Sequence, residues 1–197
     1  MRYTLTDENA LVLDYTATTD APTIINLTNH SYFNLEGQSS GSMLEQTLCL
    51  NASTFTEGNA ETCPTGRILP VAGTPMDFTR AKPIGRDIQA EYSQLQMCGG
   101  YDHNFILDKE PGMLALAAVA RSEKTGITME TYTTQPGVQL YTSNSLQNDT
   151  RPGKTGGIYG RYQGFCLETQ HIPVRLAPRI SLCGAAPRRG ISRNDDL

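Results

Sequence analysis

The sequence predicts an all-β protein with antiparallel strands, arranged as a sandwich or a barrel. Short segments in which apolar and polar residues alternate recur along most of the chain. Turn formers are abundant, with 18 glycines and 11 prolines, and helical periodicity is weak. Many short strands separated by such turns are typical of these architectures. We expect one domain over residues 1–173, because 197 residues can bury one sizeable core.

The expected strands follow from alternation with a period of two residues. In the first of them, Leu11, Leu13 and Tyr15 share one face, while Asp14 and Thr16 share the other. This first strand spans residues 11–17. Further strands are expected at residues 23–27, 44–50, 105–107, 114–120, 127–134, 138–142 and 165–167.

Three segments depart from this pattern. Residues 56–75 are predicted to form a loop, because glycines and prolines recur throughout them. Residues 83–97 are the one plausible helix, although Gly85 weakens it. Residues 174–197 contain five arginines, no lysine and no aromatic residue, and we expect this tail to be disordered and separate from the domain.

Charge and cysteine content restrict the partners and the compartment. A net charge of −4 argues against nucleic-acid binding, and no apolar run is long enough to span a membrane. The first eight residues contain no apolar core of a signal peptide. The number of cysteines, five, is odd, and no two of them are spaced as C-x-x-C. We therefore expect a reduced, cytoplasmic protein.

His30 is the first candidate for chemistry. It lies in residues 26–37, a stretch rich in amides, hydroxyls and aromatic rings, which suit the hydroxyls and C–H faces of a sugar. Glu168 could act with it as an acid/base pair if the fold brings the two together. The alternative is a structural histidine and a surface carboxylate. We expect no metal site, because neither H-x-H nor H-x-x-x-H spacing occurs, although distant ligands can converge in a β fold.

Asp102 and Gln139 are further candidates. Asp102 follows two glycines at an expected turn, where aspartate often caps the backbone. Gln139 stands between Val138 and Leu140 in an apolar strand, so it faces either solvent or a polar cavity.

Six motifs, taken in order, resemble the aldose 1-epimerase (galactose mutarotase) family. They are NLTNHSYFNL at 26–35, PTG at 64–66, GTPMDF at 73–78, GYDHNF at 100–105, QPGVQLYTSN at 135–144 and GFCLETQ at 164–170. The resemblance implies a galactose mutarotase-like antiparallel β-sandwich. It also implies the interconversion of α and β anomers of aldohexoses such as galactose and glucose, with no cofactor.

The resemblance assigns roles to individual residues. Glu168 would be the base that takes the proton from the C1 hydroxyl, and His30 the acid that protonates the ring oxygen. Four further residues would bind the sugar: Ser31, Tyr32, Asp102 and Gln139. The other two histidines, His103 and His171, would be structural. A small-molecule sugar is the expected partner, with no nucleic acid and no membrane, for a monomer or weak homodimer.

Two departures from the family pattern lead us to expect a fragment with an incomplete sandwich. Family members carry a segment before the equivalent of Arg2 that supplies strands, an arginine and a second sugar-binding histidine. After Pro173 the tail resembles nothing in the family. We therefore expect reduced activity. A non-catalytic carbohydrate-binding sandwich is the alternative. A sugar-phosphate epimerase is disfavoured, because the arginines at 67, 80 and 86 form no cluster near the motifs.

Overall fold

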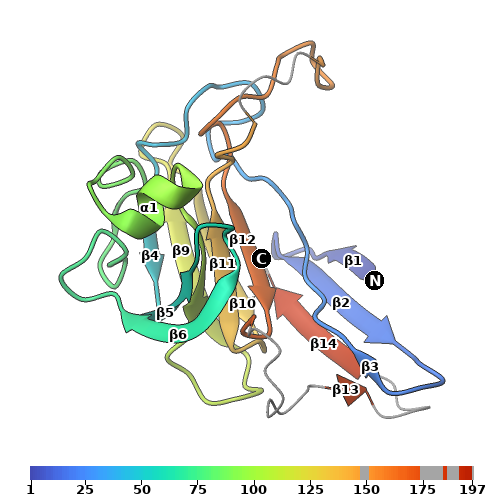
Figure 1. Ribbon diagram of the computed structural model, residues 1–197. Helices are drawn as coiled ribbons and strands as arrows, with labels where there is room; N and C mark the ends of the chain where they lie inside the picture. The colour runs from blue at the N-terminus through green and yellow to red at the C-terminus, as the bar shows by residue number, and fades with distance from the viewer. Residues whose placement is uncertain (147–150, 174–183, 186–190, 197) are drawn as a thin grey trace.

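The computed structural model describes residues 1–146, 151–173, 184–185 and 191–196 (Figure 1). Two antiparallel sheets of five and seven strands dominate it, so the all-β prediction is confirmed. Within the described residues, the one α-helix is α1, Ser93–Cys98, which is too short to cross a membrane.

The five-stranded sheet carries most of the motifs identified above. Its strand order is β12-β11-β8-β5-β6, with all neighbours antiparallel. The strands are β12 (Cys166–Gln170), β11 (Gly137–Tyr141), β8 (Asp102–Ile106), β5 (Thr54–Gly58) and β6 (Pro64–Pro70).

The seven-stranded sheet has the order β1-β2-β14-β10-β9-β4-β7, and a two-stranded ladder joins β13 to β3. Its strands are β1 (Arg2–Leu5), β2 (Leu11–Ala17), β14 (Ile191–Asp196), β10 (Thr128–Thr133), β9 (Ala115–Arg121), β4 (Thr47–Leu50) and β7 (Lys82–Pro83). The ladder is formed by β3 (Thr23–Ile24) and β13 (Gly184–Ala185).

The hydrophobic core lies between the two large sheets. The seven-stranded sheet contributes buried residues from β4 and β9, and the five-stranded sheet contributes others from β5, β8, β11 and β12. Aromatic rings form its centre, where Phe105 contacts Phe55 and Phe78, and Phe78 packs edge-on against Tyr101. This packing explains why Leu48 and Leu50 on β4, and Val138 and Leu140 on β11, are apolar and buried at alternate positions.

The predicted loop at residues 56–75 is wrong, since most of it lies in the hairpin of β5 and β6. β6 is the edge strand of its sheet, where proline costs no ladder hydrogen bond, and prolines mark both of its ends. The strands also shift register between Thr56 and Gly58, which accommodates a glycine in the ladder.

The predicted helix at residues 83–97 is mostly turns, and only its last part is helical. Gly85 lies at a close approach of two loops, since a Cβ there would lie 2.7 Å from the Leu44 Cβ. Glycine is also a poor helix former, which agrees with the turns found here. The helix that does form ends at Gly99, which adopts a left-handed conformation with φ of 64°.

The tail predicted to be disordered, residues 174–197, lies largely outside the described residues. Two parts of it are described, and both form strands. β14 pairs with β2 and β10 in the seven-stranded sheet, and β13 pairs with β3.

Candidate active site

Strand register places the candidate residues on one face of the five-stranded sheet. Gln139 on β11 lies opposite Glu168 on β12 and opposite Asn104 on β8. Two residues along, Tyr141 lies opposite both Cys166 and Asp102. Alternate residues of a strand share a face, so these six side chains form two adjacent rows on one surface. The intervening residues, which include Val138, Leu140, Phe105 and Leu167, point into the core.

The segment that carries His30 is fastened along the outer edge of β12. Asn26 Nδ2 donates to the His171 carbonyl and its Oδ1 accepts from the His171 N–H, at 3.0 and 2.9 Å. The Thr28 hydroxyl donates to the Thr169 carbonyl at 2.9 Å. Further along, Phe33 and Phe165 exchange two backbone hydrogen bonds. These contacts fix the position of His30 over the sheet face.

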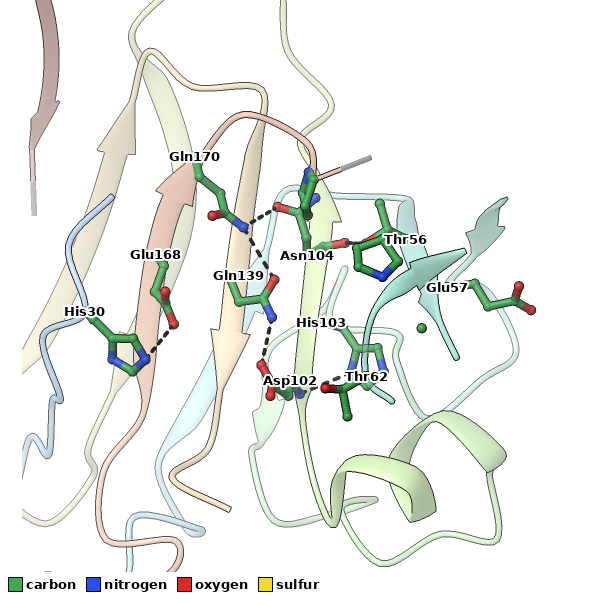
Figure 2. Close-up of a pocket in the computed structure, with 13 residues that line it drawn as sticks. His30, Thr56, Glu57, Thr62, Asp102, His103, Asn104, Gln139, Glu168 and Gln170 are labelled. Atoms are coloured by element: carbon green, nitrogen blue, oxygen red, sulfur yellow. Dashed lines mark hydrogen bonds and ion pairs between the residues drawn. The ribbon is translucent and has the colours of Figure 1, made fainter. Parts of the chain in front are cut away.

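His30 and Glu168, far apart in sequence, meet at the mouth of a cavity. The His30 Nε2 and Glu168 Oε1 atoms are 3.4 Å apart (Figure 2). The imidazole is 51% exposed, whereas the carboxylate is 11% exposed. This distance exceeds that of a normal N–H···O hydrogen bond. Neither group is held rigidly by the other, so both can exchange protons with a ligand.

The carboxylates of the site are both shifted toward their protonated forms. Burial raises the pKa of Glu168, and nearby Asp102 raises it further, while His30 opposes the shift. Burial also raises the pKa of Asp102, against a hydrogen bond from Gln139 and the influence of His30. A glutamate with a raised pKa is a stronger base once ionised, which suits proton transfer near neutral pH.

A ladder of amides continues from these groups across the sheet. Gln139 Nε2 donates to Asp102 Oδ1 at 2.8 Å. Gln170 Nε2 contacts Gln139 Oε1 at 3.5 Å and Asn104 Oδ1 at 3.4 Å. The Asn104 Nδ2 is buried without a hydrogen-bond partner. The cavity beside this ladder has a volume of about 300 Å³. Polar groups that converge on a cavity are typical of a site for a hydroxyl-rich small molecule.

Aromatic rings flank the imidazole. The His30 and Tyr32 ring centroids lie 5.1 Å apart, and Tyr141 packs edge-on against His30 at 5.7 Å. Tyr32 is 47% exposed, and burial of its hydroxyl raises its pKa to about 12, so it remains a phenol. Tyr32 and Tyr141 line a second cavity that adjoins the first and shares His30 and Asp102 with it.

The remaining sequence candidates fall into two groups. Ser31 follows His30, but among the described residues it does not line the 300 Å³ cavity; its N–H donates to Asn29 Oδ1. His103 is buried, and burial lowers its pKa to about 4, so its imidazole is neutral. The backbone of His171 holds Asn26. His103 also lines the 300 Å³ cavity, so the expected structural role of these two histidines stays a prediction.

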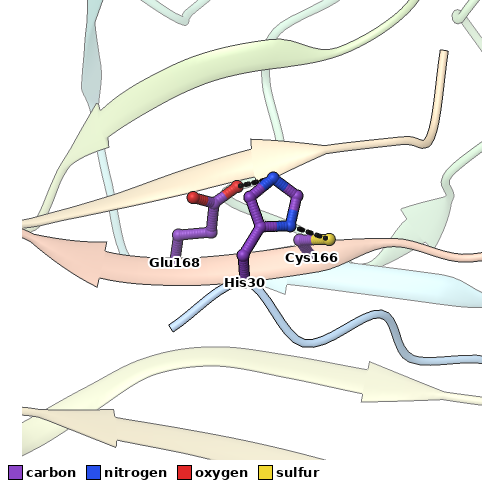
Figure 3. Close-up of side chains that lie close together, drawn as sticks. All are labelled: His30, Cys166 and Glu168. Carbon is purple, nitrogen blue, oxygen red and sulfur yellow. Dashed lines mark hydrogen bonds and ion pairs between the residues drawn. The ribbon is translucent and has the colours of Figure 1, made fainter. Parts of the chain in front are cut away.

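Sequence reasoning missed Cys166, Tyr141 and Asn104. Strand alternation could have found them, because each lies two positions from a predicted site residue in the same strand. Cys166 Sγ lies 3.4 Å from His30 Nδ1 (Figure 3).

Three of these side chains could offer atoms to a metal ion. The ligand atoms of His30, Cys166 and Glu168 lie within 4.8 Å of one another. The thiol and the carboxylate contact opposite nitrogens of the imidazole, whose lone pairs point apart, so one ion could not join all three as they lie. We therefore interpret the cluster as hydrogen-bonded, and the absence of a metal site stays a prediction.

The fold and the site together define a class of protein: an antiparallel β-sandwich that presents a carboxylate and an imidazole to one polar cavity. The family model described as "Aldose 1-epimerase" matches residues 1–180, and the chain belongs to this family. This confirms the resemblance seen in the motifs.

Individual relatives agree with this assignment. The chain is 41% identical to the galactose mutarotase of Sus scrofa over 171 residues, which are 87% of this chain and 48% of that protein. It is 38% identical to the aldose 1-epimerase of Haemophilus influenzae over 174 residues, with coverage of 87% and 49%. The crystal structure of galactose 1-epimerase from Lactobacillus acidophilus NCFM matches with a TM-score of 0.83 at 29% identity, covering 98% of this chain and 54% of that one. The chain thus spans about half the length of the curated relatives it matches.

Proposed function

We propose that this chain is an aldose 1-epimerase that interconverts the α and β anomers of aldohexoses such as galactose and glucose. The main support for this proposal is the distance of 3.4 Å between His30 Nε2 and Glu168 Oε1, which lie beside a polar cavity. Mutarotation moves protons at the C1 hydroxyl and at the ring oxygen, and both of these oxygens are bonded to C1. The acid and the base must therefore lie close together, as His30 and Glu168 do.

The reaction proceeds by opening and closing of the sugar ring. The Glu168 carboxylate takes the proton of the C1 hydroxyl, while protonated His30 gives a proton to the ring oxygen and the C1–O5 bond breaks. The open-chain aldehyde rotates about its C1–C2 bond. The C5 hydroxyl then attacks the other face of C1, with His30 taking its proton and Glu168 returning one to the aldehyde oxygen. Both side chains end in their starting states, and no cofactor is required.

The neighbouring polar groups hold the sugar in this proposal. Asp102 accepts hydrogen bonds from ring hydroxyls, and the Gln139 amide accepts from them or donates to them. Tyr32 offers an exposed aromatic face, and Ser31, next to His30 in the chain, offers a hydroxyl. A cavity of about 300 Å³ is at the small end of ligand sites, which suits a monosaccharide. Within the described part of the chain, no lysine or arginine lines this cavity, which disfavours a sugar phosphate there, whereas Arg161 lines the adjoining cavity.

We further propose that the protein works in the cytoplasm as a monomer or weak homodimer. The four cysteines that the structure describes are all unpaired, which suits a reducing compartment.

Polarimetry of freshly dissolved α-galactose tests the activity. The wild-type chain should bring the rotation to equilibrium faster than buffer, and His30→Ala and Glu168→Ala should abolish most of that acceleration. Glu110→Gln, which changes an exposed glutamate outside the cavity, is the matched control and should keep the wild-type rate.

Calorimetry with galactose separates the enzyme from a binding module. If the wild-type chain binds galactose and the rotation still equilibrates no faster than in buffer, the epimerase proposal fails. The chain would then be a carbohydrate-binding sandwich that uses the same cavity.

A further inference from the structure

Cys166 contacts the acid/base pair and has no role in the mechanism above. Its Sγ lies 3.4 Å from His30 Nδ1, the nitrogen opposite to the one that faces Glu168 (Figure 3). Cys166 is fully buried, two residues before Glu168 on the same face of β12. It therefore lies beneath the imidazole, while Glu168 lies beside the cavity.

We propose that the Cys166 thiol is a positioning residue that occupies His30 Nδ1 and so reserves Nε2 for proton exchange with the sugar. This inference rests on the proposed function, and it assigns a residue that the mechanism does not otherwise use. When His30 gives its Nε2 proton to the ring oxygen, its other proton stays on Nδ1, and Nδ1–H donates to the Cys166 sulfur. The neutral ring is then the Nδ1–H tautomer, whose Nε2 lone pair is free to take the proton of the C5 hydroxyl.

The environment of the Cys166 thiol keeps it neutral, so its sulfur acts as a weak acceptor for Nδ1–H. Burial raises the pKa of Cys166 well above its ordinary value, and Glu168 and Asp102 add to this effect. The sulfur therefore keeps its proton. Tyr141 lies opposite Cys166 in the ladder and packs edge-on against His30, while Tyr32 covers the ring from another side. These contacts hold the ring so that its Nδ1 edge faces sulfur.

A thiol suits a histidine that must act as acid in one half of the reaction and base in the other. A carboxylate at Nδ1 would favour the imidazolium throughout. The sulfur of a neutral thiol is a weak acceptor. It accepts from Nδ1–H in the imidazolium and in the neutral ring alike, so it fixes the tautomer without holding the ring in its charged form. No proton leaves the sulfur in either state, so the proton balance of the reaction is unchanged.

Nitrogen-15 NMR of the imidazoles tests this directly. The chain has three histidines, so the His30 signals can be assigned by their loss in His30→Gln. The wild-type spectrum should show the Nδ1–H tautomer for neutral His30. Cys166→Ala should shift His30 toward a mixture of tautomers, whereas Cys166→Ser, which keeps a donor and an acceptor, should restore the wild-type pattern. Cys166→Val, which removes the acceptor and keeps the volume, repeats the test if the alanine variant does not fold.

Kinetics supply the second readout. Loss of one hydrogen bond to the acid should lower kcat about threefold to tenfold in Cys166→Ala, with little change in KM and with rescue by serine. Cys49→Ala, which removes a thiol from β4 in the other sheet, should leave kcat unchanged. If Cys166→Ala and Cys166→Val keep the wild-type His30 tautomer, the inference is overturned. Because the tautomer is read without turnover, an inactive wild-type chain would refute the epimerase proposal and leave this test intact.

Discussion

Burial of the His103 imidazole makes the stability of this fold depend on pH. The residue is 3% exposed, and its ring packs edge-on against Phe55 with centroids 5.8 Å apart. Its Nδ1 accepts the Asp102 N–H at 3.1 Å, and Cys98 Sγ lies 4.0 Å from its Nε2. Removal from water disfavours the charged ring and lowers the pKa from 6.5 to about 4.

The size of the effect follows from these two pKa values. Between pH 6.5 and pH 4, the unfolded chain binds a proton at His103 that the folded chain does not, so stability falls as the pH falls. Each pKa unit corresponds to about 1.4 kcal/mol, so the full loss is about 3 kcal/mol. Between pH 7 and pH 4.5, the loss from this residue should be about 2 kcal/mol. Above pH 7 the contribution no longer changes.

Urea unfolding of the wild type and His103→Asn at pH 7 and pH 4.5 measures this contribution. The asparagine oxygen can accept the Asp102 N–H in place of Nδ1, and it does not titrate. The free energy of unfolding of the wild type should fall by about 2 kcal/mol more than that of the variant. The raised pKa values of Asp102 and Glu168 act in the opposite direction, but they act in both proteins and cancel in the comparison. An equal loss in the two proteins would refute the reasoning.

Three further predictions concern the site and its supports. Because burial raises the pKa of Glu168, the rate of mutarotation should fall on acidification with a midpoint above the ordinary glutamate pKa of 4.5. Polarimetry across pH measures this midpoint, and a value at or below 4.5 would contradict the prediction. Glu168→Gln should lower the rate about 10²- to 10⁴-fold. The Lys82 side chain is 3% exposed, and its ammonium lies 2.7 Å from the Asp87 carboxylate. Asp87→Asn removes this counter-ion, so it should lower the free energy of unfolding in urea by about 3 kcal/mol. An unchanged unfolding midpoint would count against the ion pair. Gly100→Ala should lower the melting temperature more than Gly112→Ala does. A Cβ at Gly100 would lie 2.3 Å from Asn144 Oδ1, whereas one at Gly112 would meet nothing within 4 Å. Equal shifts in melting temperature would show that the close approach to Asn144 is unimportant.

The strands were predictable where apolar and polar residues alternate. The segments of β2, β9, β10 and β11 were placed within one or two residues of their observed bounds. The hairpin of β5 and β6 was not, because glycine and proline obscure the alternation in an edge strand. Whether a proline lies at an edge depends on the order of strands in the sheet, which local patterns do not contain.

In the candidate site, too, local patterns identified residue types, while the strand order and register decided which residues lie together. The motifs identified His30, Glu168, Asp102 and Gln139 as chemically suitable, and the register of β8, β11 and β12 brings three of them onto one face. Cys166 was overlooked because a buried cysteine in a strand reads as an ordinary core residue. Its place two residues before Glu168 puts it on the site face, and its distance to His30 Nδ1 gives it a contact there.

The sequence by itself determined the all-β class, most of the strands and the residue types available for acid/base chemistry, because these depend on local periodicity and composition. The tertiary structure decided which of those residues meet. His30 reaches Glu168 because Asn26 and Thr28 hydrogen-bond to the outer edge of β12, and this contact joins segments at opposite ends of the domain. Such long-range hydrogen bonds arise from packing of the whole sandwich, which local sequence patterns cannot specify.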